Sequence, residues 1–198
     1  MSTNPVVRWP VLLLLPLILM LMLLVTGCAT PAPETPPQAT TDPLGMSNPR
    51  AEFTVTLQES TPLPLRIGQP VTLDLNSSAD SYLNLYTIGT AGTTTQLLTN
   101  YPVRANEAVS FPPMTSKRFH YLPEPPPGEE AFILVATRQP LRLMGRHDLK
   151  ETRKPRTPVA ALKLSGPQLL ERLREALRRR PPGQWNAVSL QLPLAGPH

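Results

Sequence analysis

The side chains that commonly perform catalysis are few in this chain, and they lie far apart in the sequence. The histidines are His120, His147 and His198, and no two of them have the spacing of paired metal ligands. Glu124, Glu129 and Glu130 flank a Pro-Pro-Pro-Gly turn, which is typical of an exposed connector rather than of two catalytic carboxylates. No Gly-x-Ser-x-Gly elbow and no phosphate-binding loop occurs in the sequence. We therefore expect no enzyme activity, no cofactor and no metal site.

Cys28 is the only cysteine, and its surroundings give it a chemistry of its own. An uncharged apolar run ends in Leu24-Val25-Thr26-Gly27, directly before Cys28, and Arg8 precedes the run. A positive charge, an apolar stretch and small residues are typical of a secretory signal, so we predict a signal peptide over residues 1–27. The alternative is an uncleaved membrane helix over residues 9–25, which is short for a span and contains two prolines.

The passage Leu24–Cys28 resembles the lipobox of bacterial lipoproteins. The resemblance implies that residues 1–27 are removed and that the sulfur and the new amino group of Cys28 carry acyl chains such as palmitate. Two or more chains would hold the protein stably on a membrane. Because Ala29 stands where an aspartate would favour the inner membrane, the resemblance also implies the outer membrane, facing the periplasm.

Residues 28–49 are predicted to be the acylated cysteine and a proline-rich tether. Proline contributes 27 of the 198 residues, and this segment contains little apolar bulk besides Pro, Ala and Thr. Such a composition buries too little surface to offset the entropy cost of ordering. The alternative is that the segment packs along the folded domain.

Charge is distributed unevenly along the chain. Residues 138–198 contain 13 Lys and Arg against 4 Asp and Glu. This excess suits an anionic glycan, a lipid headgroup or an acidic protein surface. We expect no nucleic acid as a partner, because the predicted signal implies export and no aromatic residues interleave with the basic ones. The candidate contacts are Arg146, Lys150, Arg153, Lys154, Arg178, Arg179 and Arg180. The alternative is a basic surface that only interacts with water, as we expect for His147 and Asp148.

Residues 50–140 are predicted to form a β domain, because apolar and polar residues alternate with a period of two. Strands are predicted over residues 53–58, 71–76, 82–88, 94–99, 107–111, 118–122 and 130–137. The turn Gly89-Thr90-Ala91-Gly92 predicts a hairpin between the third and fourth of these. Residues 131–136 are apolar on both faces, which indicates a central strand. The fold class is mainly β: an antiparallel β-sandwich or open barrel with one C-terminal amphipathic helix.

Residues 141–198 are predicted to be a basic loop, a helix and one further strand, packed on the sandwich. Ser165 suits a helix N-cap and Pro167 the first helical turn, and leucines recur on one face up to residue 177. Pro181-Pro182-Gly183 ends the helix, and residues 185–192 could add a strand. The alternative for the helix is a position on a membrane surface.

The stretch from Leu65 to Leu141 resembles the domain-of-unknown-function family 4384. The resemblance is carried by four passages in order: Arg66-Ile67-Gly68 with Val71-Thr72-Leu73, the strand from Ser81 to Tyr86, Leu97-Leu98-Thr99-Asn100 with residues 103–107, and Pro126-Pro127-Gly128-Glu129-Glu130 with residues 133–136. It implies a small β-sandwich-like module of exported bacterial proteins, and no catalytic residue is transferred by it.

The expected function is therefore that of a lipid-anchored envelope protein. Its β-sandwich would serve as a non-catalytic binding or assembly module for a periplasmic or secretion-type complex, with an envelope protein as partner. The alternative is a structural envelope protein that binds peptidoglycan or lipopolysaccharide through its basic C-terminal region.

Overall fold

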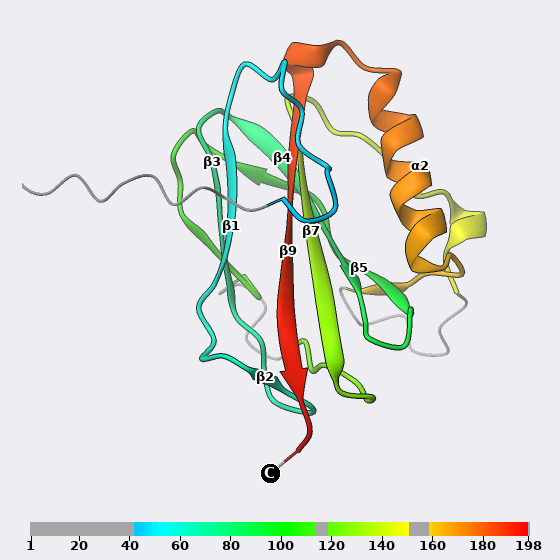
Figure 1. Ribbon diagram of the computed structural model, residues 1–198. Helices are drawn as coiled ribbons and strands as arrows, with labels where there is room; N and C mark the ends of the chain where they lie inside the picture. Colours follow the sequence, from blue (N-terminus) through cyan, green and yellow to red (C-terminus); the bar gives the residue numbers. More distant parts are fainter. Residues whose placement is uncertain (1–41, 114–118, 151–158, 198) are drawn as a thin grey trace, which may run out of the picture. The chain divides into compact units, whose positions relative to one another are not determined.

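The computed structural model describes residues 42–113, 119–150 and 159–197 (Figure 1). The chain divides into two units, Met1–Gln38 and Ala39–His198, and all described residues belong to the second. The predicted signal peptide, Cys28 and the first part of the tether lie outside the described residues, as do Arg153, Lys154 and His198.

The described residues form two β-sheets and one α-helix, which confirms the prediction of a mainly β fold. The smaller sheet has the order β1-β3-β6 and consists of β1 (Val55–Glu59), β3 (Leu73–Ser77) and β6 (Val109–Phe111). The larger sheet curls into a half-barrel with the order β2-β9-β7-β4-β5-β8. Its strands are β2 (Leu65–Arg66), β4 (Ser81–Ile88), β5 (Thr94–Val103), β7 (Gly128–Thr137), β8 (Ala160–Ala161) and β9 (Trp185–Ala195). All pairs in both sheets are antiparallel except β2 with β9.

Strand β7 shows why the larger sheet needs apolar residues on both of its faces. Phe132, Leu134 and Ala136 point into a core between the two sheets. Ile133 and Val135 alternate with them and belong to a second core on the opposite face. Because β7 lies between β9 and β4, its continuous apolar sequence is that of a central strand, as predicted.

The second core lies beneath helix α2 (Gly166–Arg178). Leu169, Leu173 and Leu177 are fully buried there, at the helical spacing that the sequence shows. Ser165 is the N-cap of the helix, as predicted, and its N–H donates to Gln168 Oε1 at 2.8 Å. Figure 1 shows α2 on the far side of the larger sheet from β1 and β3. Short 3₁₀ turns occupy Arg146–Asp148 (η3) and Pro182–Gln184 (η4).

Of two further predicted β elements, the structure confirms one and contradicts the other. The hairpin is confirmed: β4 and β5 flank a turn in which Gly92 has a φ of +76°. The strand predicted over residues 118–122 is wrong for the described part of that segment, where Tyr121 makes only an isolated bridge with Val71. Tyr121 instead directs its hydroxyl to Glu130 and packs edge-on against Phe132, so it serves the core rather than a sheet.

Residues 42–49 are not part of a free tether, so this part of the tether prediction is wrong. Met46 is 3% exposed and belongs to the second core. Asp42 accepts hydrogen bonds from the hydroxyl and the N–H of Ser189 in β9, and Arg174 of α2 donates to the carbonyl oxygen of Leu44 at 2.7 Å. We call residues 42–49 the strap, because they run across the domain between α2 and β9.

Candidate functional site

A pocket lies where β7 ends and the chain leaves α2. Its cavity volume is about 390 Å³. It is lined by Thr137, Gln139, Pro140, Leu141, Arg180, Pro181 and Gln184. The first four residues form one wall, which we call the β7 wall, and the last three form the α2 wall. The site thus joins two segments that are far apart in the sequence.

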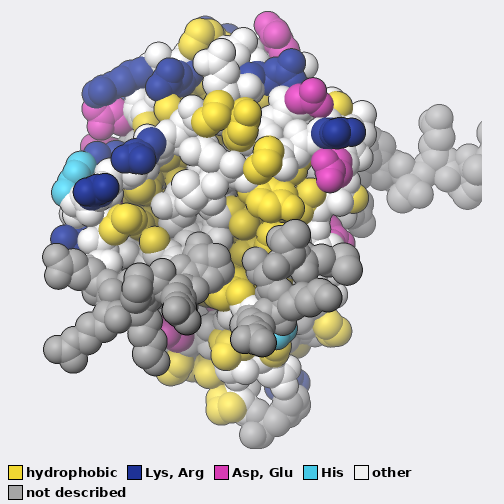
Figure 2. Space-filling model, turned by 180° about the vertical axis from the view of Figure 1, so that it is seen from behind, with side chains coloured by type: hydrophobic (Ala, Val, Ile, Leu, Met, Phe, Trp, Pro, Cys, Tyr) yellow, Lys and Arg dark blue, Asp and Glu magenta, His cyan; other side chains and the backbone are white. Residues whose placement is uncertain are grey.

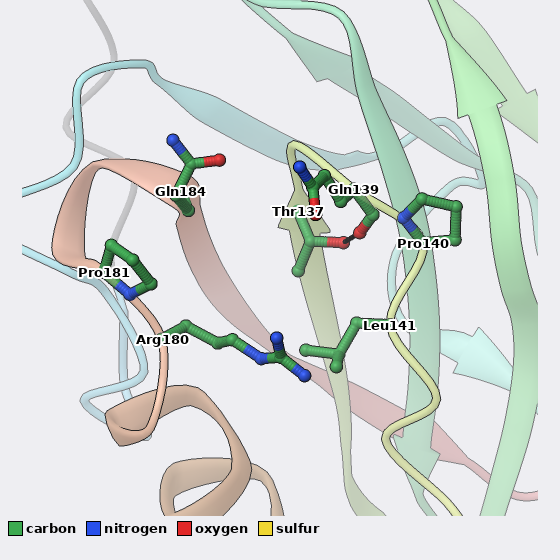
Figure 3. A pocket seen from close by; sticks show the side chains of 7 residues that line it. All are labelled: Thr137, Gln139, Pro140, Leu141, Arg180, Pro181 and Gln184. Atoms are coloured by element: carbon green, nitrogen blue, oxygen red, sulfur yellow. Dashed lines mark hydrogen bonds between the residues drawn. The ribbon is translucent and has the colours of Figure 1, made fainter.

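Arg180 is the charged side chain of this pocket. Figure 3 shows its side chain reaching across the pocket toward Leu141. Within the described part of the chain, Arg180 makes no ion pair and its guanidinium donates no hydrogen bond. An exposed guanidinium that is not neutralised by its own fold can pair with an external carboxylate in a bidentate manner.

Two carboxamides accompany the guanidinium. Gln139 and Gln184 lie on opposite walls and are exposed (Figure 3). Their side chains make no hydrogen bond with other described residues, whereas the hydroxyl of Thr137 already donates to the carbonyl oxygen of Gln139 at 2.8 Å. The two amides therefore offer donors and acceptors to a ligand, and Thr137 has a structural role.

The β7 wall is held by a chain of asparagines. Asn84 is fully buried in β4, and its side-chain oxygen accepts the N–H of Asn100 at 3.1 Å. Asn100 has a φ of +46°, which asparagine tolerates, and its own side-chain oxygen accepts the N–H of Leu141 at 2.9 Å. This chain of hydrogen bonds fixes the start of the loop that forms the wall.

The α2 wall is held by the strap. Asn48 donates its side-chain N–H groups to the carbonyl oxygens of Pro182 at 2.6 Å and Trp185 at 2.9 Å. The two walls are joined directly, since the N–H of Arg138 donates to the carbonyl oxygen of Gln184 at 2.9 Å. Both walls are therefore fixed by the protein before any ligand enters.

The segments next to the pocket carry more basic than acidic residues, but one acid lies beside the α2 wall: the carboxylate of Glu52 is in contact with Gly183. The sequence from residue 137 to 147 contains three arginines and no acid, and the sequence from 178 to 187 contains three arginines and no acid. Figure 2 shows Lys and Arg side chains gathered over the upper part of the rear face, with some acidic side chains among them. The nearby acid Glu175 is paired with Arg179, so it does not neutralise Arg180.

The predicted anion contacts are brought together only in part. Arg178, Arg179 and Arg180 are exposed at the end of α2, and Arg180 alone of them lines the pocket. Arg146 and Lys150 are exposed on the loop between β7 and β8 and do not line it.

Asp148, in the same loop, is not solvated as expected. It is 2% exposed, and one of its oxygens accepts the N–H of Gly145 at 2.8 Å. The other oxygen lies 3.2 Å from His147 Nε2 and 3.5 Å from the Arg172 guanidinium. This carboxylate closes the 3₁₀ turn and links it to α2, while His147 itself is exposed, as predicted.

Glu130 is a second departure from expectation, because it is buried rather than exposed. One of its oxygens accepts the hydroxyls of Thr87, at 2.8 Å, and of Tyr121. The other oxygen has no hydrogen-bond partner among the described residues. Burial is the main cause that raises the pKa of Glu130, and Glu124 raises it further, against the lowering effect of the two hydroxyls. The same burial raises the pKa of Tyr121.

Sequence reasoning missed Gln139, Gln184 and the asparagines that support the walls. The signal that could have found the support was Asn84, a polar residue within the apolar strand from Ser81 to Ile88. A buried amide in such a position must be hydrogen-bonded, which indicates a structural task. Gln139 lies in a loop and Gln184 ends the 3₁₀ turn η4, and neither carries a comparable signal.

Among the described residues, no group of His, Cys, Asp and Glu side chains could hold a metal ion. In the same residues, no helix is both long and apolar enough to cross a bilayer.

The described residues form a mainly β domain with a pocket at one end of its central strand. Residues 64–140 match the family described as a domain of unknown function (DUF4384), so the chain contains a domain that resembles this family, as predicted. The matched region includes β2 to β7 and most of the β7 wall, whereas the α2 wall lies beyond it. No curated protein and no solved structure matches the chain.

Proposed function

We propose that this protein is a lipid-anchored envelope protein whose β domain is a non-catalytic binding module. The observation that supports the module is Arg180, an exposed guanidinium that pairs with no other described residue, in a pocket whose lining residues include no acid. A charge left unpaired by the fold is available to a partner, and complementary charges favour both association and register.

The anchor in this proposal is Cys28, acylated after removal of residues 1–27. Its support comes from the sequence alone, as does the assignment to the outer membrane, facing the periplasm. The strap adds a structural argument: the chain that leads back toward Cys28 is hydrogen-bonded to β9 and α2 at Asp42 and Leu44. The tether would thus enter the domain at the two elements between which the α2 wall lies.

The binding role is tested by site-specific photocrosslinking in intact cells. A photoreactive amino acid replaces Pro140, at the exposed edge of the pocket, and Thr56 in β1 serves as the matched control on the smaller sheet. We expect a discrete adduct with one envelope protein from position 140, lost when Arg180→Gln is added, and none from position 56. Equal adducts at both positions, or an adduct at 140 that ignores Arg180→Gln, would contradict the proposal.

The anchor is tested separately by Cys28→Ala. We expect the wild-type protein in the outer-membrane fraction of a density gradient. The Cys28→Ala variant should give no mature acylated protein in that fraction. Wild-type protein in the inner-membrane fraction would overturn the localisation, and unchanged membrane attachment of the variant would overturn the anchor.

The alternative function, binding of peptidoglycan or lipopolysaccharide, is supported by the basic residues outside the pocket. Arg146, Lys150 and Arg178 are exposed and form no ion pair with other described residues. Co-sedimentation with purified peptidoglycan that is lost in Arg178→Gln but kept in Arg180→Gln would favour this alternative. The converse pattern would favour recognition through the pocket.

A further inference from the structure

We infer that the pocket binds a single carboxylate group carried by a peptide segment of the partner. This inference rests on the proposed function and adds the chemistry of the ligand. It follows from the composition of the pocket: one guanidinium, two carboxamides on opposite walls, and the apolar surfaces of Pro140, Leu141 and Pro181.

The electrostatics favour a monoanion over a phosphate. Arg180 is the cation that lines the pocket, and it lies at the C-terminal end of α2, where its N–H donates to the carbonyl oxygen of Leu177 at 2.9 Å. The C-terminal end of a helix has a partial negative charge, so it opposes a dianion more strongly than a carboxylate. Phosphate sites usually use the opposite end of a helix, where backbone N–H groups point at the ligand.

The two glutamines favour a peptide as the carrier of that carboxylate. Each amide has an NH₂ donor and a carbonyl acceptor, the same pair of groups that a peptide bond offers in return. Gln139 and Gln184 approach from opposite walls, so a segment that lies between them can be hydrogen-bonded on both sides (Figure 3). A cavity of about 390 Å³ lies within the usual range for ligand sites.

The walls are fixed before the ligand binds. Asn100 holds Leu141, Asn48 holds the turn at Pro182, and the Arg138–Gln184 hydrogen bond closes the gap between them. The entropy cost of binding then comes mainly from ordering the side chains of Arg180 and the two glutamines. Because this cost is small, a ligand that makes few contacts, such as a small anionic group, is sufficient.

The test uses the full-length chain in detergent micelles and three probe peptides. The first is N-acetyl-Ala-Ala-Ala with a free C-terminal carboxylate, the second is N-acetyl-Ala-Glu-Ala-amide, and the third is the uncharged N-acetyl-Ala-Ala-Ala-amide. Binding is followed by NMR signals of the side-chain amides of Gln139 and Gln184. We expect saturable shifts of both amides with a carboxylate peptide and none with the uncharged peptide.

The variants separate this site from general basic charge. Arg180→Gln should weaken carboxylate binding by about tenfold, the effect of one lost charge-assisted pair. Arg178→Gln, which removes a neighbouring charge outside the pocket, should change it by less than about twofold at ordinary ionic strength. The charged peptide that binds more tightly shows whether the carboxylate comes from a chain terminus or from an acidic side chain.

Several results would overturn the inference. They are equal binding of the uncharged peptide, inorganic phosphate binding more tightly than acetate, and equal losses in Arg178→Gln and Arg180→Gln. If the crosslink from position 140 persists while no carboxylate peptide binds, the inference fails and the proposed function stands. If vesicles with anionic lipid shift the glutamine amides and the peptides do not, a membrane surface replaces the peptide as ligand.

Discussion

The two ends of strand β7 place ionisable groups in opposite environments, one buried and one exposed. At its beginning, Glu130 is 0% exposed, and its carboxyl group is closed off by Thr87 and Tyr121. At its end, Thr137 opens onto a pocket in which Arg180 is exposed and makes no ion pair with a described residue. One end therefore shields an ionisable group from water, and the other presents one to it.

This difference separates a structural polar group from a functional one. A carboxyl group without a cationic partner is tolerated inside a protein when it stays protonated and hydrogen-bonded. Burial raises the pKa of Glu130, and one of its oxygens accepts the hydroxyls of Thr87 and Tyr121, so its task is to tie β7 to β4 and to the segment that carries Tyr121. The guanidinium of Arg180 pairs with no other described residue, so substitution of Arg180 should weaken recognition and leave stability unchanged.

The largest effect on stability is expected at the beginning of β7, where Glu130 is buried. Glu130→Ala leaves a cavity and deprives the hydroxyls of Thr87 and Tyr121 of a shared acceptor. We expect the free energy of unfolding to fall by about 2–4 kcal/mol, measured by urea unfolding at pH 5. Glu129→Ala is the matched control, because Glu129 is exposed one position earlier in β7, and it should change stability by less than about 0.5 kcal/mol. Equal losses in the two variants would mean that Glu130 is not sealed.

The second prediction concerns the dependence of stability on pH. Burial raises the pKa of Glu130, so the folded protein keeps this proton to a higher pH than the unfolded chain, whose glutamates titrate near about 4.3. The free energy of unfolding should therefore fall as the pH rises from about 4.3 through the folded pKa, by at most about 1.4 kcal/mol per pH unit for one proton. Glu130→Gln cannot titrate and should lack this part of the slope. Parallel pH profiles for the two proteins would refute a raised pKa.

The third prediction tests whether the strap supports the open end. Asn48→Ala removes the two hydrogen bonds to the carbonyl oxygens of Pro182 and Trp185. We expect a loss of about 1–2 kcal/mol in the free energy of unfolding, together with weaker carboxylate binding because the α2 wall is released. Ser47→Ala changes the exposed neighbour and should affect neither quantity. An Asn48→Ala protein with wild-type stability would show that the strap is only loosely attached.

Much of the fold follows from local patterns in the sequence. The apolar run of β7, the glycine turn between β4 and β5 and the Ser165 cap of α2 each specify their element through neighbours in the chain. No local pattern specifies the two-residue strands β2 and β8, because they exist only through pairing with β9 and β5. The prediction of a strand at Tyr121 is wrong because Glu130, which accepts its hydroxyl, is brought near it only by the fold.

The candidate site was predictable only as a region of charge. The basic residues at the end of α2 indicate an anion-binding surface, but they do not show which arginine enters a pocket. That choice depends on the loop at Leu141, which Asn100 holds, and on the strap residue Asn48, which the proline-rich composition assigned to a tether. Both supports are contacts between distant parts of the chain, and no local pattern reports them.

The smallest effect on stability, and the sharpest contrast with Glu130, is expected for Arg180. Arg180→Gln removes a charge that makes no ion pair with other described residues, so the free energy of unfolding should change by less than about 0.5 kcal/mol. The same variant should lose about tenfold in carboxylate binding, so stability and recognition separate at this residue. Thermal unfolding and the peptide titration are measured on one preparation to exclude differences in folding. A stability loss as large as that of Glu130→Ala would show that Arg180 has an internal partner, and the contrast between the two ends of β7 would then disappear.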